Sequence, residues 1–121
     1  MPQSAGLHEP ADSLRPETVE RHRALVSLME ELEAVDWYDQ RVDATADPEL
    51  AVVLAHNRDE EKEHAAMTLE WLRRHDAVLE HNLRKYLFST GDITEGEGEE
   101  GRHSAGGDGS LGIGALKDAK R

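Results

Sequence analysis

The chain has 121 residues, a formal net charge of −12 and no cysteine. This length fits one domain of modest size, and the lack of cysteine excludes disulfides, thiolate metal sites and iron–sulfur clusters. The acidic balance disfavours nucleic acid as a partner, because phosphate binding needs a basic face. It suits cations, although it is also compatible with a merely soluble acidic surface. We expect no membrane span and no signal peptide, which fits a cytoplasmic protein.

The first long element is a helix predicted from Pro16 to about Ala46, after an irregular lead-in over residues 1–15. Proline suits the first turn of a helix, and the stretch that follows contains neither glycine nor another proline. Apolar side chains recur along it at the three- and four-residue steps of a heptad pattern, which Asp39 interrupts. The positions in this series are Leu25, Leu28, Leu32, Val35 and Val42.

A second helix is predicted to begin at residues 47–49, Asp-Pro-Glu, and to run to about Arg74. Aspartate there is an N-cap, proline occupies the first helical position and glutamate suits the first turn. Because the joint is short, the two helices should fold back as an antiparallel hairpin. A shorter third helix is predicted over residues 76–88. The predicted fold class is therefore all-α, with the helical domain covering residues 16–88.

The composition changes after residue 88. Nine of the ten glycines lie beyond position 90, so residues 89–109 are predicted to be a disordered Gly/Glu-rich linker. Apolar residues return in residues 110–121, which is typical of a docking peptide at the tip of a flexible arm. Stray aliphatic residues also occur in unstructured C-termini, so this signal is weak alone.

The second predicted helix has a polar interruption in the middle of an apolar face. That face follows three- and four-residue steps through Leu50, Leu54, Asn57, Glu61, His64, Thr68 and Trp71. Glu61 and His64 are one turn apart, which puts a carboxylate oxygen and an imidazole nitrogen side by side, as a metal ion needs.

The first helix contributes Glu31, on the same face as Leu28, Val35 and Tyr38. Burying an unpaired carboxylate is costly, and metal coordination is one way to offset the cost. Di-iron carboxylate bundles need a Glu from each of two helices and Glu-x-x-His from each of the other two, which is twice what this chain offers. A two-helix hairpin also cannot enclose a core alone. A twofold dimer would form a ferritin-like four-helix bundle, which supplies the full number of ligands and encloses a core.

Simpler interpretations stay open. Glu-x-x-His arises by chance in a Glu-rich helix, and Glu30, Glu31 and Glu33 could form a solvated face. Trp37 and Tyr38 are residue types that usually pack in a core. The chain could then be a non-enzymatic helical adaptor with a docking tail. It could also be a di-manganese or other di-metal oxidase, because iron, manganese and zinc all accept Glu and His ligands.

Several stretches resemble the encapsulated ferritins of bacteria. They are Met-Glu-Glu-Leu-Glu-Ala-Val-Asp-Trp-Tyr at 29–38, His-Asn at 56–57, Glu-Glu-Lys-Glu-His at 60–64 and Met-Thr-Leu-Glu-Trp at 67–71. The resemblance covers about residues 8–90. The terminal residues 109–117 resemble the cargo-loading peptide by which such proteins are captured in an encapsulin shell.

The resemblance implies a helical hairpin with a short third helix, whose dimers form a ring-shaped homodecamer. It also implies a ferroxidase that oxidises Fe²⁺ to Fe³⁺ at a di-iron site shared between two subunits, while the surrounding encapsulin shell, bound through residues 110–117, stores the mineral. The matching ligands are Glu31, Glu61 and His64. Tyr38 matches a tyrosine beside that centre, with Trp37 nearby, and Glu30 and Glu33 match acids that guide incoming metal.

Overall fold

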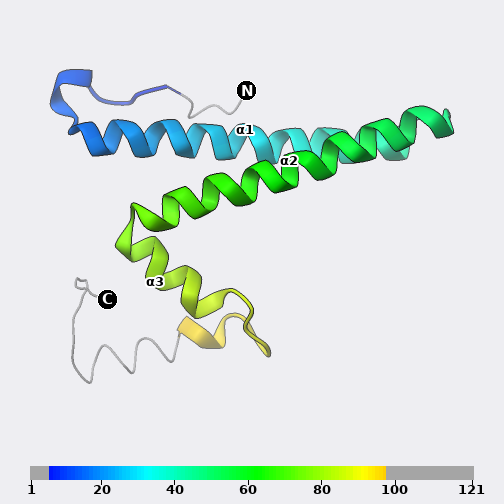
Figure 1. Cartoon of the computed structure of the whole chain (residues 1–121). Helices are drawn as coiled ribbons and strands as arrows, with labels where there is room; N and C mark the ends of the chain where they lie inside the picture. Colours follow the sequence, from blue (N-terminus) through cyan, green and yellow to red (C-terminus); the bar gives the residue numbers. More distant parts are fainter. Residues whose placement is uncertain (1–5, 98–121) are drawn as a thin grey trace. The chain divides into compact units, whose positions relative to one another are not determined.

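The computed structural model describes residues 6–97, and within them the chain is helical with no strand. A short 3₁₀ turn, η1, precedes three α-helices (Figure 1). Their bounds are Ala11–Ser13 for η1, Pro16–Ala44 for α1, Pro48–Arg74 for α2 and Ala77–Tyr86 for α3. The predicted all-α class and the three predicted helices are confirmed. In the described part of the chain, no helix has the length and apolarity that crossing a membrane requires.

The joint between α1 and α2 is built as its residues predict. The amide of Thr45 donates to the carbonyl of Arg41 at 3.0 Å and closes α1. Asp47 then accepts a hydrogen bond from the amide of Glu49 at 3.0 Å through Oδ1, the capping contact expected before a helix that begins with proline. The chain reverses within this joint, so α1 and α2 run antiparallel (Figure 1).

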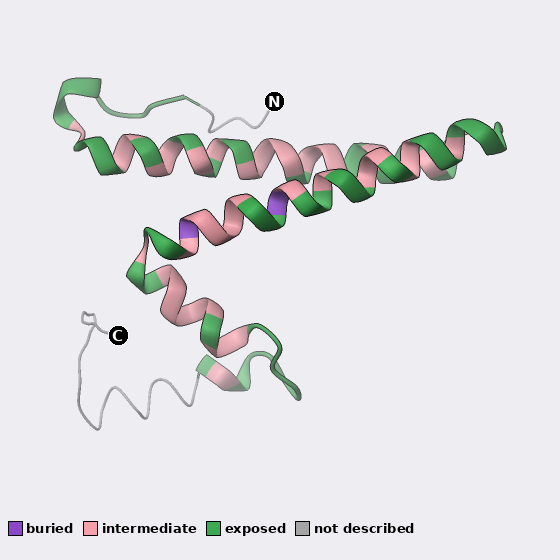
Figure 2. Ribbon diagram, in the orientation of Figure 1, coloured by how far each residue is buried: buried purple, intermediate pink, exposed green. Residues whose placement is uncertain are grey.

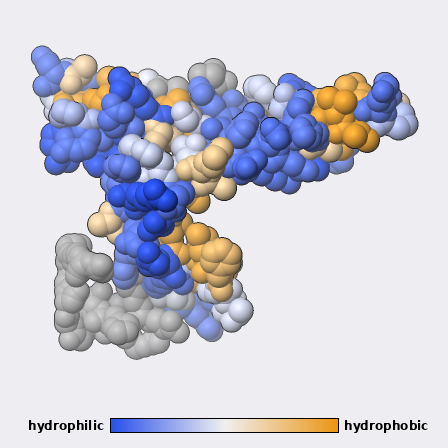
Figure 3. All heavy atoms as spheres, viewed as in Figure 1, coloured by the Kyte–Doolittle hydropathy of each residue, from blue (hydrophilic) through white to orange (hydrophobic). Residues whose placement is uncertain are grey.

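Little apolar surface is buried in the single chain. Among the described residues, only Ala65, 8% exposed, and Leu72, 2% exposed, form a buried hydrophobic core. Figure 2 shows that the rest of α1 and α2 is half-buried or exposed. Hydrophobic atoms lie at the surface near the start of α2 in Figure 3, where Leu50, Val52 and Val53 are exposed. Exposed apolar surface of this extent is typical of a surface that another molecule covers.

The first part of the predicted linker, residues 89–97, forms hydrogen-bonded turns. The amide of Glu95 donates to the carbonyl of Asp92 at 3.2 Å. The Asp92 carboxylate accepts from the hydroxyl of Thr94 at 2.7 Å, and this contact holds the pKa of Asp92 below its ordinary value. The rest of the predicted linker, residues 98–109, and the predicted shell-binding segment, residues 110–121, lie outside the described residues.

Helix α3 begins with a side-chain cap that gives a direct test of local stability. Asp76 Oδ1 accepts from the amide of Leu79 at 3.0 Å. Asp76→Ala is expected to destabilise α3 by about 1 kcal/mol, because an orphan amide of the first turn loses its acceptor. Faster hydrogen exchange of the α3 amides would report the change. Asp76→Asn keeps an acceptor oxygen and should stay near wild type, so equal losses in the two variants would contradict a capping role.

Candidate metal site

The structure brings the predicted Glu-x-x-His pair together on α2. His64 Nδ1 lies 3.5 Å from Glu61 Oε1, and the two side chains are 43% and 27% exposed. Ligand atoms about 2 Å from one ion lie roughly 3 Å from each other. Small side-chain rotations therefore suffice for the carboxylate and the imidazole to reach a common cation. Their partial exposure leaves the pair accessible from outside the chain.

Glu31, on α1, has a carboxylate oxygen that is buried without a hydrogen-bond partner, unlike the partly exposed Glu61–His64 pair. The residue is half-buried, and its Oε1 atom is buried without a hydrogen-bond partner. A buried carboxylate oxygen without a donor or a cation is energetically costly, and buried polar atoms in native proteins are nearly always satisfied. Within residues 6–97 no side chain supplies the hydrogen-bond donor that this oxygen lacks. A cation would satisfy it, and carboxylate oxygens are ligands that hard metal ions accept.

The described residues of one chain do not assemble a complete metal site. Within residues 6–97, no group of three or more His, Asp or Glu side chains is positioned to hold a metal ion. The structure pairs Glu61 with His64 but does not bring Glu31 into a cluster with them. The described residues thus offer a two-residue ligand pair on one helix and a half-buried carboxylate with one buried oxygen on the other.

The Arg41 side chain of α1 lies near the rings of both Tyr38 and Trp37. The Arg41 guanidinium lies 5.3 Å from the ring centroid of Tyr38 and 5.9 Å from that of Trp37. Tyr38 is half-buried and lies two helical turns after Glu31, on the same face of α1. Arg41 is not among the residues predicted from the sequence, although its three- and four-residue spacing from the two rings is the signal of side chains that meet on a helix.

The remaining predicted residues flank Glu31. Glu30 and Glu33 are both half-buried on α1, so the single chain shields them in part. His56 is exposed on α2, with Nε2 3.7 Å from Glu60 Oε2. These acids neighbour the candidate ligands in sequence, and the chain places none of them in a metal-binding group within its described residues.

Arg41 provides a test of how Tyr38 is held. Arg41→Gln is expected to lose the cation–π contacts, worth about 0.5–1 kcal/mol at an exposed site, and to loosen both rings. In a Trp71→Phe background, Trp37 is the remaining tryptophan, and its fluorescence emission should shift and its anisotropy fall. Arg41→Lys, which keeps the charge, should show a smaller change. Unchanged emission in Arg41→Gln would show that Arg41 does not hold these rings.

Comparisons with known proteins show the family of the chain. The sequence profile of the EncFtn-like family matches residues 6–90. The "Encapsulated ferritin-like protein" of Rhodospirillum rubrum is 64% identical over 125 residues, covering 94% of this chain and 89% of the relative. The "Encapsulin nanocompartment cargo protein EncC" of Myxococcus xanthus is 27% identical over 110 residues, covering 91% of this chain and 85% of the relative.

A solved structure is similar to this chain in fold and sequence. The crystal structure of protein ne0167 from Nitrosomonas europaea is similar at a TM-score of 0.71 and 58% sequence identity, covering 73% of this chain and 97% of that one. The family match spans all three α-helices and every candidate ligand. The chain therefore belongs to the EncFtn-like family of encapsulated ferritin-like proteins.

Proposed function

We propose that this protein is a ferroxidase, in which two copies of the chain hold Fe²⁺ between them and oxidise it to Fe³⁺. The observation that carries the proposal is the buried, unpartnered oxygen of Glu31. Glu61 and His64, 3.5 Å apart on the neighbouring helix, supply the complementary ligands. The names of the relatives, an encapsulated ferritin-like protein and an encapsulin cargo protein, support an iron-related role.

The proposed site is completed by a second copy of the chain. A twofold dimer doubles the set to one Glu and one Glu-x-x-His from each subunit, the number that a di-iron bundle requires. Val53 and Met67 support this assembly, because both are exposed and lie at helical steps on either side of His64. A second hairpin on this surface would bury them. The ring-shaped homodecamer implied by the resemblance belongs to the same proposal.

The side chains act mainly as ligands and as a source of negative charge. The carboxylates of Glu31 and Glu61 supply hard anionic oxygens, and His64 supplies one imidazole nitrogen in each subunit. Anionic ligands stabilise the more highly charged ferric ion relative to the ferrous ion, which favours loss of an electron. A pair of substrate ions supplies the two electrons that O₂ or peroxide accepts. Tyr38, two turns from Glu31, provides a hydroxyl on the same face of α1.

The proposal extends to a partner and a compartment. We propose that residues 110–117 bind an encapsulin shell protein, so that the chain works in the lumen of the shell and the ferric product is mineralised there. The names of the two relatives support this, because one is called encapsulated and the other a nanocompartment cargo protein. Deleting residues 110–121 should abolish co-purification with co-expressed shell protein, while the truncated chain should bind iron normally.

The test of the activity is an anaerobic titration of the purified protein with Fe²⁺, followed by exposure to air. Ferric absorbance and native mass are recorded together. Saturation near one iron per chain, rapid oxidation and an even-numbered oligomer are the expected results. An absence of stoichiometric binding, or oxidation no faster than in buffer, would overturn the ferroxidase proposal.

The incomplete ligand set among the described residues of one chain also fits a helical adaptor, which would use the exposed apolar surface for docking without binding metal. An adaptor should assemble equally well in the presence of a chelator and should show no iron stoichiometry in the titration. Repeating the titration with Mn²⁺ tests the di-manganese alternative, because both metals accept these ligands.

A further inference from the structure

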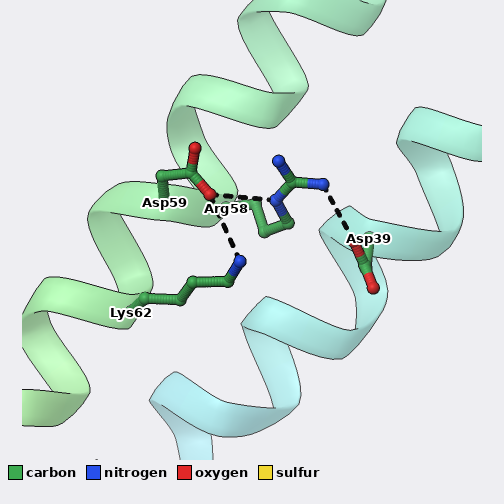
Figure 4. A network of polar contacts seen from close by, with 4 residues as sticks. All are labelled: Asp39, Arg58, Asp59 and Lys62. Atoms are coloured by element: carbon green, nitrogen blue, oxygen red, sulfur yellow. Dashed lines mark hydrogen bonds and ion pairs between the residues drawn. The ribbon is translucent and has the colours of Figure 1, made fainter.

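An ion pair connects the two helices of the hairpin at the point where the apolar series of α1 is interrupted. Arg58 Nη1 on α2 lies 2.9 Å from Asp39 Oδ1 on α1 (Figure 4). Asp39 takes the heptad position that Leu25 and Leu32 occupy earlier in the same helix. The aspartate thus stands where continuing the pattern calls for an apolar residue, and a specific partner explains its presence.

The guanidinium of Arg58 is held from a second side. Its Nε donates to Asp59 Oδ1 at 3.0 Å, and Lys62 Nζ lies 3.4 Å from the same oxygen (Figure 4). The hydrogen bond from Arg58 is the main reason that the pKa of Asp59 lies below its ordinary value. The Arg58 side chain is 22% exposed, whereas the side chain of Asp39 is 63% exposed. Two carboxylates from different helices therefore fix its position.

The pair lies close to the candidate ligands along both helices. Glu31 precedes Asp39 by eight residues, about 12 Å along α1, and His64 follows Arg58 by six residues, about 9 Å along α2. Since the helices are antiparallel, these two displacements run in the same direction. The ion pair consequently lies beside one end of the proposed ligand set and links the two helices that carry it.

We propose that Asp39 and Arg58 are positioning residues that set the rotation of α2 relative to α1. They thereby present Glu31 and the Glu61–His64 pair toward the same second chain. This inference rests on the proposed function. An ion pair in which one partner is largely exposed, as Asp39 is here, contributes little stability. A single polar residue in an apolar heptad series instead specifies how helices align.

The test separates alignment from stability. Asp39→Leu restores the apolar series, and Asp39→Leu/Arg58→Met replaces the whole pair. Both should keep the helix content and the denaturant midpoint close to those of wild type, because a largely exposed ion pair contributes little stability. Their affinity for Fe²⁺, titrated without oxygen, should fall about 10- to 100-fold, as when groups that orient metal ligands are removed. The double variant should lose no more affinity than the single one, because paired residues act as a unit.

Asp36 provides the matched control. It lies one turn before Asp39 on α1, and its carboxylate is exposed and accepts from Gln40 of the same helix at 3.2 Å. Asp36→Leu makes the same change in charge without a cross-helix contact, so its Fe²⁺ affinity should equal that of wild type. Asp39→Asn, which keeps the side-chain shape, is the second test variant and should also bind Fe²⁺ more weakly.

The outcomes distinguish this inference from the proposed function. If wild type binds Fe²⁺ and the Asp39 variants bind it equally well, the positioning role is overturned while the metal site stands. If the Asp39 variants lose helix content or midpoint in proportion to affinity, the pair is a stability element and the inference again fails. If wild type itself binds no Fe²⁺, both the proposed function and this inference are overturned. Weaker binding at an unchanged midpoint supports the alignment.

Discussion

Glu31→Gln is expected to lower the affinity for Fe²⁺ by more than about 100-fold, beyond the loss that follows when only an outer-shell group is removed. The amide has nearly the same shape as the carboxylate but lacks its charge, so it is a poor ligand for a hard cation. The same change should raise the stability of the metal-free protein, because it removes a charged group whose Oε1 atom is buried without a partner. Binding and stability should therefore move in opposite directions.

An anaerobic Fe²⁺ titration measures the first effect, and denaturant unfolding in a chelator measures the second. Glu17→Gln is the matched control, since Glu17 is an exposed acid in the first turn of the same helix. It should leave Fe²⁺ binding at the wild-type level. Wild-type binding by Glu31→Gln would remove this residue from the site, and a lower midpoint would show that its carboxylate is satisfied in solution.

Leu72→Ala is expected to destabilise the hairpin by about 2–5 kcal/mol. Leu72 is 2% exposed and is the largest fully buried side chain among the described residues. Truncating a buried leucine removes its transfer free energy and leaves a cavity. For so small a core this is a large share of a typical stability of about 5–15 kcal/mol. Denaturant unfolding followed by circular dichroism gives the measurement, and a loss under about 1 kcal/mol would contradict the packing.

Leu25→Ala is the control for this prediction and tests the assembly as well. Leu25 is 47% exposed in the single chain, so at low protein concentration the substitution should cost about 1 kcal/mol or less. If a second chain covers this residue, its cost should grow as the protein concentration rises, because association is linked to folding. If Leu72→Ala destabilises the protein more than Leu25→Ala at every protein concentration, Leu72 lies in the core of the individual chain.

Helix positions could be predicted because their signals are local. Proline at the start of α1, the Asp-Pro-Glu at residues 47–49 and the heptad steps of the leucines act over a few residues. The structure begins α1 at Pro16 and α2 at Pro48, as predicted. The Glu-x-x-His pair is equally local, since one helical turn determines that Glu61 and His64 meet. Its 3.5 Å contact follows from their spacing.

The contacts between helices could not be predicted in the same way. The interruption at Asp39 was visible in the sequence, but its partner Arg58 lies 19 residues away on the other helix. Which side chains meet there depends on the rotation of each helix about its axis, which is set by packing and not by periodicity. The buried state of Glu31 Oε1 has the same origin.

The sequence by itself therefore determined three helices, a hairpin and a ligand pair, because turn chemistry and helical spacing are properties of neighbouring residues. Only the tertiary structure showed that Ala65 and Leu72 are the buried apolar residues of the described part of the chain, and that one carboxylate oxygen is left without a partner. Burial depends on what each face packs against, and packing joins residues that are distant in the sequence.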